Sequence, residues 1–188
     1  MEEIAELKRR LAEERPQAWE AFPDLGLYMD QIISYMPRQL IHFDEGESLT
    51  SAMVNNYIKD GMLPRAEGKR YHRTHLAYLT AICALKQVLS VKDASRLIGA
   101  GAGIPGKDTE ALYAHFCREL DAALNETAES LTEDVGEEEL PKLALALALR
   151  SYADKLACQR VLEILQSRQP QPEKAKEKAK KPPKSENE

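Results

Sequence analysis

The sequence predicts a mainly α-helical protein with one small hairpin of two short strands and a helical C-terminal part. Apolar residues recur every three or four positions over most of residues 1–168, which is the period of a helix with one buried face. Proline and glycine interrupt this pattern at the points where helices are expected to end. Only residues 62–72, with Pro64 and Gly68, have the short extended pattern of a two-stranded hairpin.

The first two predicted helices are bounded by prolines. Residues 2–14 form a charged helix with a narrow apolar face, and Pro16 ends it. Residues 24–36 form a second helix with a broad apolar face, which ends at Pro37. The connection at 37–47 is long enough to hold one short strand.

The third predicted helix runs to Lys59 and begins at one of two cap residues. Ser48 and Thr50 are both of the residue types whose hydroxyl groups cap a helix N-terminus. Gly61 is placed to end the same helix, because glycine readily takes the left-handed backbone conformation found there.

Four further helices are predicted after the hairpin. Residues 74–89 form a long apolar helix, and residues 91–98 form a short one that a serine caps. The glycine-rich stretch 99–106 separates these from two longer helices at 109–132 and 138–168. This stretch resembles half of a dinucleotide-binding loop, but that loop follows a strand and a helix precedes it here.

The pattern divides the chain into four parts. They are an N-terminal helix at 1–23, a hairpin-containing domain at 24–98, a C-terminal helical hairpin at 107–168 and a tail at 169–188. The tail is rich in Pro, Lys and Glu and has no apolar residue larger than Ala. It therefore cannot contribute to a core and is predicted to be disordered.

Composition and targeting signals indicate a cytoplasmic protein. The longest mostly apolar run, 143–149, is too short to cross a bilayer. The N-terminus is acidic, unlike a secretory signal. The three cysteines are scattered in apolar helices, which indicates a reducing compartment rather than a disulfide framework.

Charge is distributed unevenly along the chain. The formal net charge is −5, but residues 50–75 contain five basic and two acidic residues, or net +3. Residues 107–139 contain eleven acidic and two basic residues, or net −9. Phosphate binding responds to the local potential, so the basic segment is a candidate nucleic-acid site.

The basic segment also carries short polar side chains on its predicted helix. Asparagine is a poor helix former, but its amide can form two hydrogen bonds with adenine in the major groove. Cations at the helix end and hairpin would contact phosphates, and Tyr71 either packs beneath the hairpin or offers its hydroxyl to a phosphate. The predicted DNA-binding residues are Thr50, Ser51, Asn55, Asn56, Lys59, Arg65, Lys69, Arg70, Tyr71 and Arg73.

The order of features in this segment resembles that of MerR-type winged helix-turn-helix regulators. These proteins have a recognition helix with an aromatic residue near its end, a Gly-Leu-Leu-Pro-like turn, a wing with a Tyr-Arg-Tyr-like patch and then an apolar helix. Tyr57, Gly61-Met-Leu-Pro64, Lys69-Arg-Tyr71 and the helix from Leu76 take those places here. Together with Tyr28-Met-Asp-Gln31, the segment looks like a bacterial domain family of unknown function that is related to MerR in its binding half.

The resemblance covers about residues 25–98 and implies a winged helix-turn-helix followed by a C-terminal helical hairpin. It also implies a transcription regulator that binds double-stranded DNA sequence-specifically and dimerises through its C-terminal helices. One departure concerns Asn55 and Asn56, where MerR relatives commonly have Arg followed by Tyr. A second is the connection after residue 36, which is longer than the tight turn of those relatives.

Other functions receive less support from the sequence. The asparagines and the basic hairpin can also be read as solvated surface, which leaves a non-catalytic protein-interaction module as the alternative function. His72 and His75 are three residues apart, but no third ligand lies near them in the sequence. We find no catalytic constellation, so the sequence predicts no enzyme, cofactor, metal or membrane partner, and any small-molecule effector stays open.

Overall fold

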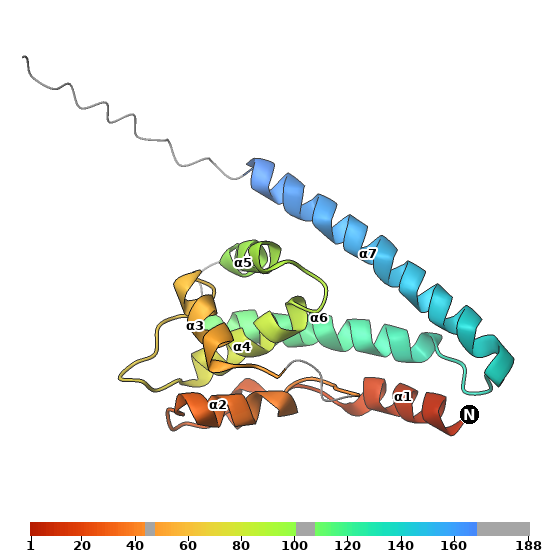
Figure 1. The fold of residues 1–188 in the computed structure, drawn as a ribbon, viewed down its shortest axis with the longest axis horizontal. Helices are drawn as coiled ribbons and strands as arrows, with labels where there is room; N and C mark the ends of the chain where they lie inside the picture. Colours follow the sequence, from red (N-terminus) through yellow and green to blue (C-terminus); the bar gives the residue numbers. More distant parts are fainter. Residues whose placement is uncertain (44–47, 101–107, 169–188) are drawn as a thin grey trace, which may run out of the picture.

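In a computed structural model, which describes residues 1–43, 48–100 and 108–168, the chain is mainly helical (Figure 1). The elements in this described part are α1 (Glu2–Glu13), η1 (Trp19–Ala21), α2 (Met29–Tyr35), η2 (Met36–Arg38), α3 (Ser51–Lys59), α4 (Arg73–Leu85), α5 (Val91–Gly99), α6 (Thr109–Ser130), η4 (Glu137–Glu139) and α7 (Leu140–Arg168). The predicted class is therefore confirmed. Among these helices, none combines the length and apolar character needed to cross a bilayer.

The middle of the molecule is formed by α4 and α6, which contact each other (Figure 1). The first helix, α1, lies beside α6, and the Arg15 guanidinium that follows it donates to Asn125 Oδ1 of α6 at 2.6 Å. Helix α3 packs against α2, and α7 contacts α5. The segment between α3 and α4 projects from the end of the molecule opposite the turn between α6 and α7 (Figure 1).

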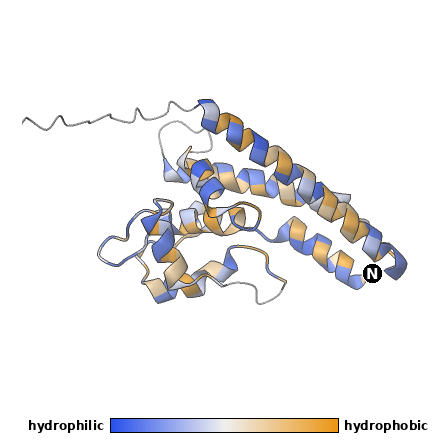
Figure 2. Ribbon diagram, turned by 45° about the horizontal axis from the view of Figure 1, so that its top comes forward, coloured by the Kyte–Doolittle hydropathy of each residue, from blue (hydrophilic) through white to orange (hydrophobic). Residues whose placement is uncertain are grey.

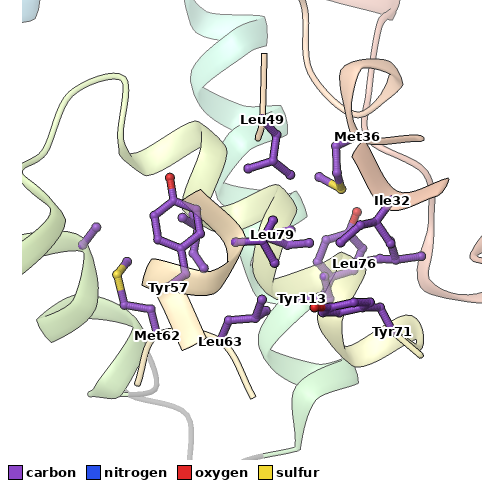
Figure 3. Packing of buried hydrophobic residues seen from close by; sticks show 14 of the residues in the cluster. Ile32, Met36, Leu49, Tyr57, Met62, Leu63, Tyr71, Leu76, Leu79 and Tyr113 are labelled. Carbon is purple, nitrogen blue, oxygen red and sulfur yellow. The ribbon is translucent and has the colours of Figure 1, made fainter. Parts of the chain in front are cut away.

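A single hydrophobic cluster holds α2, α3, α4 and α6 together (Figure 3). Ile32, Val54, Leu76 and Leu79 are fully buried in it. Each such side chain contributes about 1.5–3 kcal/mol when it leaves water. Tyr113 brings α6 into the same cluster, and its hydroxyl donates to the Gln17 carbonyl at 2.8 Å.

The predicted helix caps are confirmed for α3 and α5. Thr50 Oγ1 accepts a hydrogen bond from the Met53 N–H at 3.2 Å, so Thr50 rather than Ser48 caps α3. Ser90 Oγ accepts from the Asp93 N–H at 3.1 Å and caps α5. A cap satisfies an N–H group that has no partner inside the helix, which is why these residue types locate a helix start in the sequence.

The prediction of one helix over 24–36 is wrong at its N-terminal end. Leu27 has extended backbone and exchanges two hydrogen bonds with Tyr71, each 2.8 Å long. Helix α2 therefore begins only at Met29, where the Gln31 side chain accepts from the Tyr28 N–H at 2.8 Å. The predicted helix over 74–89 likewise ends early, at Leu85.

The predicted two-stranded wing is also wrong, since no strand forms in the described residues of this segment. A tight turn stands in its place, closed by two hydrogen bonds between Glu67 and Arg70 of 3.0 and 2.9 Å. The hairpin does not extend, because Tyr71 pairs with Leu27 instead and Pro64 has no N–H for a ladder. The strand considered in 37–47 is absent from residues 37–43, and 44–47 lie outside the described residues.

The C-terminal helices α6 and α7 follow the predicted boundaries within a few residues. Asp108 caps α6 by accepting from the Glu110 N–H at 3.0 Å. The glycine-rich break falls mostly at 101–107, outside the described residues, and so does the tail at 169–188.

Candidate nucleic-acid interface

The outer face of α3 carries small polar side chains, one alanine and one lysine. Ser51, Asn55, Asn56 and Lys59 are exposed, and the described part of the chain offers their side chains no hydrogen bond or ion pair. They lie on the side of the helix away from the core, because helical residues three or four apart share a face. Their donors and acceptors are therefore available to a ligand.

The inner face and C-terminal end of α3 are fixed by the fold. Val54 and Tyr57 are buried, and the Tyr57 side chain points into the cluster shown in Figure 3. The Tyr57 carbonyl accepts from the N–H groups of Met62 and Leu63 at 2.9 and 3.1 Å. Gly61 has φ +72°, a conformation that glycine adopts without steric cost. These contacts hold the outer face of α3 in one orientation.

The tight turn after α3 presents two further cations. Gly68 and Lys69 both have positive φ, +57° and +66°, as the two central residues of a type I′ hairpin turn do. This conformation directs the Lys69 side chain into solvent. Arg65, two residues before the turn, is also exposed, and neither cation is paired within the described residues.

Arg70 has internal partners, unlike its neighbour Lys69. Its guanidinium donates to the Gly26 carbonyl at 3.0 Å and to the Tyr28 hydroxyl at 2.9 Å. It also lies over the Tyr28 ring, 4.5 Å from the centroid. Arg70 thus fixes the turn to the segment before α2. Its side chain is still exposed, but its guanidinium already takes part in that contact.

Tyr71 and Arg73 are parts of the fold rather than of an exposed site. Tyr71 is 5% exposed, its ring is nearly perpendicular to the His75 ring with the two centroids 5.3 Å apart, and burial raises its pKa. It therefore packs beneath the turn, the first of its two predicted alternatives. The Arg73 guanidinium donates to the Phe22 carbonyl at 3.1 Å and forms an ion pair with Asp24.

The two histidines stabilise the start of α4. His75 is buried, and its Nδ1 accepts from the His72 N–H at 2.9 Å. Its Nε2 lies 3.2 Å from the Arg65 carbonyl, which makes the Nε2–H tautomer the consistent one. Across the described residues, no three or more His, Cys, Asp or Glu side chains are grouped to hold a metal ion.

The structure thus brings part of the predicted set together. Five exposed side chains without partners in the described chain follow one another along α3 and the turn: Asn55, Asn56, Lys59, Arg65 and Lys69. Ser51 adds a hydroxyl on α3, while Thr50 serves as the helix cap. Arg70, Tyr71 and Arg73 instead link the turn to residues 22–28.

Residues 26–28 are the part of the site that sequence reasoning missed. Gly26 lies so close to the turn that a Cβ there would approach His72 Cε1 to 2.7 Å and Arg70 Cβ to 2.8 Å. Tyr28 supplies the ring and hydroxyl that hold Arg70. The signal was present in the sequence, because a glycine is unfavourable inside the helix predicted for 24–36.

One family model matches the chain, over residues 17–116, and its description is a domain of unknown function, DUF1836. The match covers more than half of the chain and includes α2 through the turn to the first part of α6. Neither the curated proteins nor the solved structures contain a match.

Proposed function

The chain belongs to the DUF1836 family of domains of unknown function, and we propose that it binds double-stranded DNA sequence-specifically as a transcription regulator. The exposed polar face of α3, together with the cations Lys59, Arg65 and Lys69 that have no partner among the described residues, supports this proposal most directly. These cations lie in a protein with a formal net charge of −5. A local basic site on an acidic protein attracts phosphate, while the rest of the surface does not bind nucleic acid non-specifically.

In the proposed complex, α3 enters the major groove and the turn contacts the backbone. Asn55 and Asn56 have the amide groups that read adenine, and Ser51 can donate to or accept from a base edge. Lys59, Arg65 and Lys69 contact phosphates, which fixes the position of the helix but carries little sequence information. The relation to MerR-type regulators, without their two-stranded wing, is part of this proposal.

The proposal also includes a homodimer, in which two copies present two α3 helices to two half-sites. Four large side chains on α7 are exposed between 48% and 61% of their surface: Leu145, Leu149, Tyr152 and Leu156. Their spacing of four, three and four residues places them on one face. The opposite face carries Cys158 and Leu162, which pack on the core. Figure 2 shows that apolar residues recur along the length of α7. A second copy would cover this stripe.

The proposal predicts a defined salt dependence of DNA binding. Three phosphate contacts for each protomer give a slope of log K against log salt of about −2.7 for one copy and about −5.4 for a dimer. Replacing Lys69 by Gln removes one contact for each protomer, so the slope of a dimer becomes shallower by about 2. Replacing Asn55 by Ala costs about 1–3 kcal/mol on the preferred site and little on other sequences.

The test is fluorescence anisotropy over a salt series, on duplexes selected from a random library by the full chain. Lys142→Gln on α7 is the matched control for Lys69→Gln, because it removes the same charge from another exposed position. The proposal is overturned if neither Lys69→Gln nor Asn55→Ala changes the affinity for DNA. It is also overturned if no duplex binds at about 50 mM salt, where phosphate contacts are strongest.

A second candidate is a protein-interaction module that keeps this fold without binding DNA. Its support is that Arg70 and Arg73, two of the five cations counted from the sequence, have internal partners. The acidic residues between 108 and 139 would then supply the docking surface. Failure of all duplexes to bind in the anisotropy experiment is the result that favours this candidate.

A further inference from the structure

A cavity of about 1410 Å³ lies behind α3, on the side away from the candidate DNA-binding face. Residues 36–43 form one of its walls, and the segment that follows α1 forms another. The end of α4 and the middle of α6 complete the boundary. This volume exceeds the roughly 300–1,000 Å³ of a typical small-molecule site, so an extended organic molecule fits within it.

Most of the cavity surface is apolar. The large apolar side chains that line it include Met36, Leu40, Leu49, Met53, Leu120 and Leu124. They come from four separate parts of the chain, and several of them belong to or pack against the hydrophobic core. The apolar body of a ligand binds favourably to such a surface, because binding removes both apolar surfaces from water.

The charges around the cavity are not balanced. The two carboxylates at its edge, Glu13 and Glu14, are each bound by an arginine of α1 that does not line the cavity. Two lining cations, Arg38 and Lys86, have no carboxylate partner within the described residues. The unbalanced charge is therefore positive, and an anionic group is its natural counterpart.

Lys86 is the better placed of the two cations. Its side chain is partly buried, and its Nζ donates to the Tyr57 hydroxyl at 3.0 Å. An ammonium group has three donors, so two stay available after this bond. A ligand oxygen is the kind of acceptor that these two donors lack.

From these features we infer that the cavity binds an amphipathic organic anion, with its apolar body among the leucines and methionines and its acid group near Lys86. Met53 and Tyr57 line the cavity and belong to α3. The ligand therefore contacts the back of the helix whose front face carries the proposed DNA site. The binding site itself does not depend on the DNA proposal and is tested without DNA.

The test is isothermal titration of the full chain with dodecanoate below its micelle concentration, beside the uncharged analogue dodecanol. Dodecanoate is expected to bind about tenfold more tightly than dodecanol, since the acid group adds a charge-assisted hydrogen bond. Lys86→Met keeps the apolar stem and should remove this preference. Leu124→Trp adds bulk to the cavity wall and should weaken the binding of both compounds.

Two controls separate this cavity from other apolar surface. Leu149→Glu disrupts the exposed stripe of α7, and Lys142→Gln removes an exposed cation elsewhere; neither should change the affinity for dodecanoate. Urea unfolding verifies that Lys86→Met and Leu124→Trp are folded, and Lys86→Gln replaces Lys86→Met if that variant is not. The inference is overturned if dodecanoate does not bind or if dodecanol binds equally tightly. It is also overturned if binding is lost in Leu149→Glu but not in Leu124→Trp.

Discussion

Arginines that lie a few positions apart in this chain have different roles, and their neighbours in space decide which. Arg65 is exposed and unpaired among the described residues. Arg70 lies over an aromatic ring, and Arg73 links the start of α4 to residues 22–24. Counting charges along the sequence gives these residues equal weight. Only the first is free to contact a phosphate without breaking an internal bond.

We predict that Arg73→Ala lowers the free energy of unfolding by about 1–2 kcal/mol, because it leaves the Phe22 carbonyl without its charged donor. The ion pair with Asp24 adds little, since Asp24 is mostly exposed. Arg65→Ala is the matched control and should change stability by less than about 0.5 kcal/mol. Urea unfolding of both variants measures the difference. A loss of less than about 0.5 kcal/mol in Arg73→Ala would show that its bond to the Phe22 carbonyl does not stabilise the fold.

At the scale of single elements, local signals were sufficient for some helices and not for others. The hydroxyl caps at Thr50 and Ser90 and the glycine at 61 act within a few residues, and the sequence located α3 and α5 from them. The start of α2 depends instead on the pairing of Leu27 with Tyr71, 44 positions away in the chain. No local pattern contains that contact, so the sequence alone predicts a helix for residues 24–28.

The same contact makes Gly26 sensitive to substitution. Gly26→Ala should destabilise the fold by about 1–3 kcal/mol, because its Cβ would come within 2.8 Å of atoms of His72 and Arg70. Gly99→Ala at the end of α5 is the control: no atom of the described residues lies within 4 Å of its Cβ position, so stability should stay the same or rise by up to about 1 kcal/mol. Thermal unfolding followed by circular dichroism compares the two. A neutral Gly26→Ala would mean that residues 26–28 separate easily from the turn.

For the whole molecule, the sequence predicted the helical class and the two long C-terminal helices, but not which face of α7 meets the body. Both faces are apolar: Leu145 and Leu149 are exposed on one, while Cys158 and Leu162 pack on the core from the other. Periodicity identifies a helix but cannot choose between two apolar faces. The sequence also could not show which cations of the candidate DNA site are free. The hydrogen bonds of Arg70 and Arg73 are to residues far away in the chain, and only the tertiary structure shows them.

The exposed face of α7 leads to a prediction about assembly. Leu149→Glu combined with Leu156→Glu should convert a dimer into a folded monomer, because each glutamate would otherwise lose its hydration in the dimer seam. Val161→Glu is the control, since Val161 is 63% exposed on the same helix but lies away from the stripe. Sedimentation equilibrium gives the mass of each variant, and circular dichroism verifies that its helices are intact.

Assembly and DNA binding are linked through the salt dependence. If two copies bind together, the double glutamate variant should have about half the salt slope of the unmodified chain, because each monomer contributes the same phosphate contacts. A monomeric unmodified chain, or dissociation of the Val161→Glu control to the same extent, would contradict the assignment of the stripe to a second copy. A dimer that survives the double substitution would place the subunit interface on another part of the molecule.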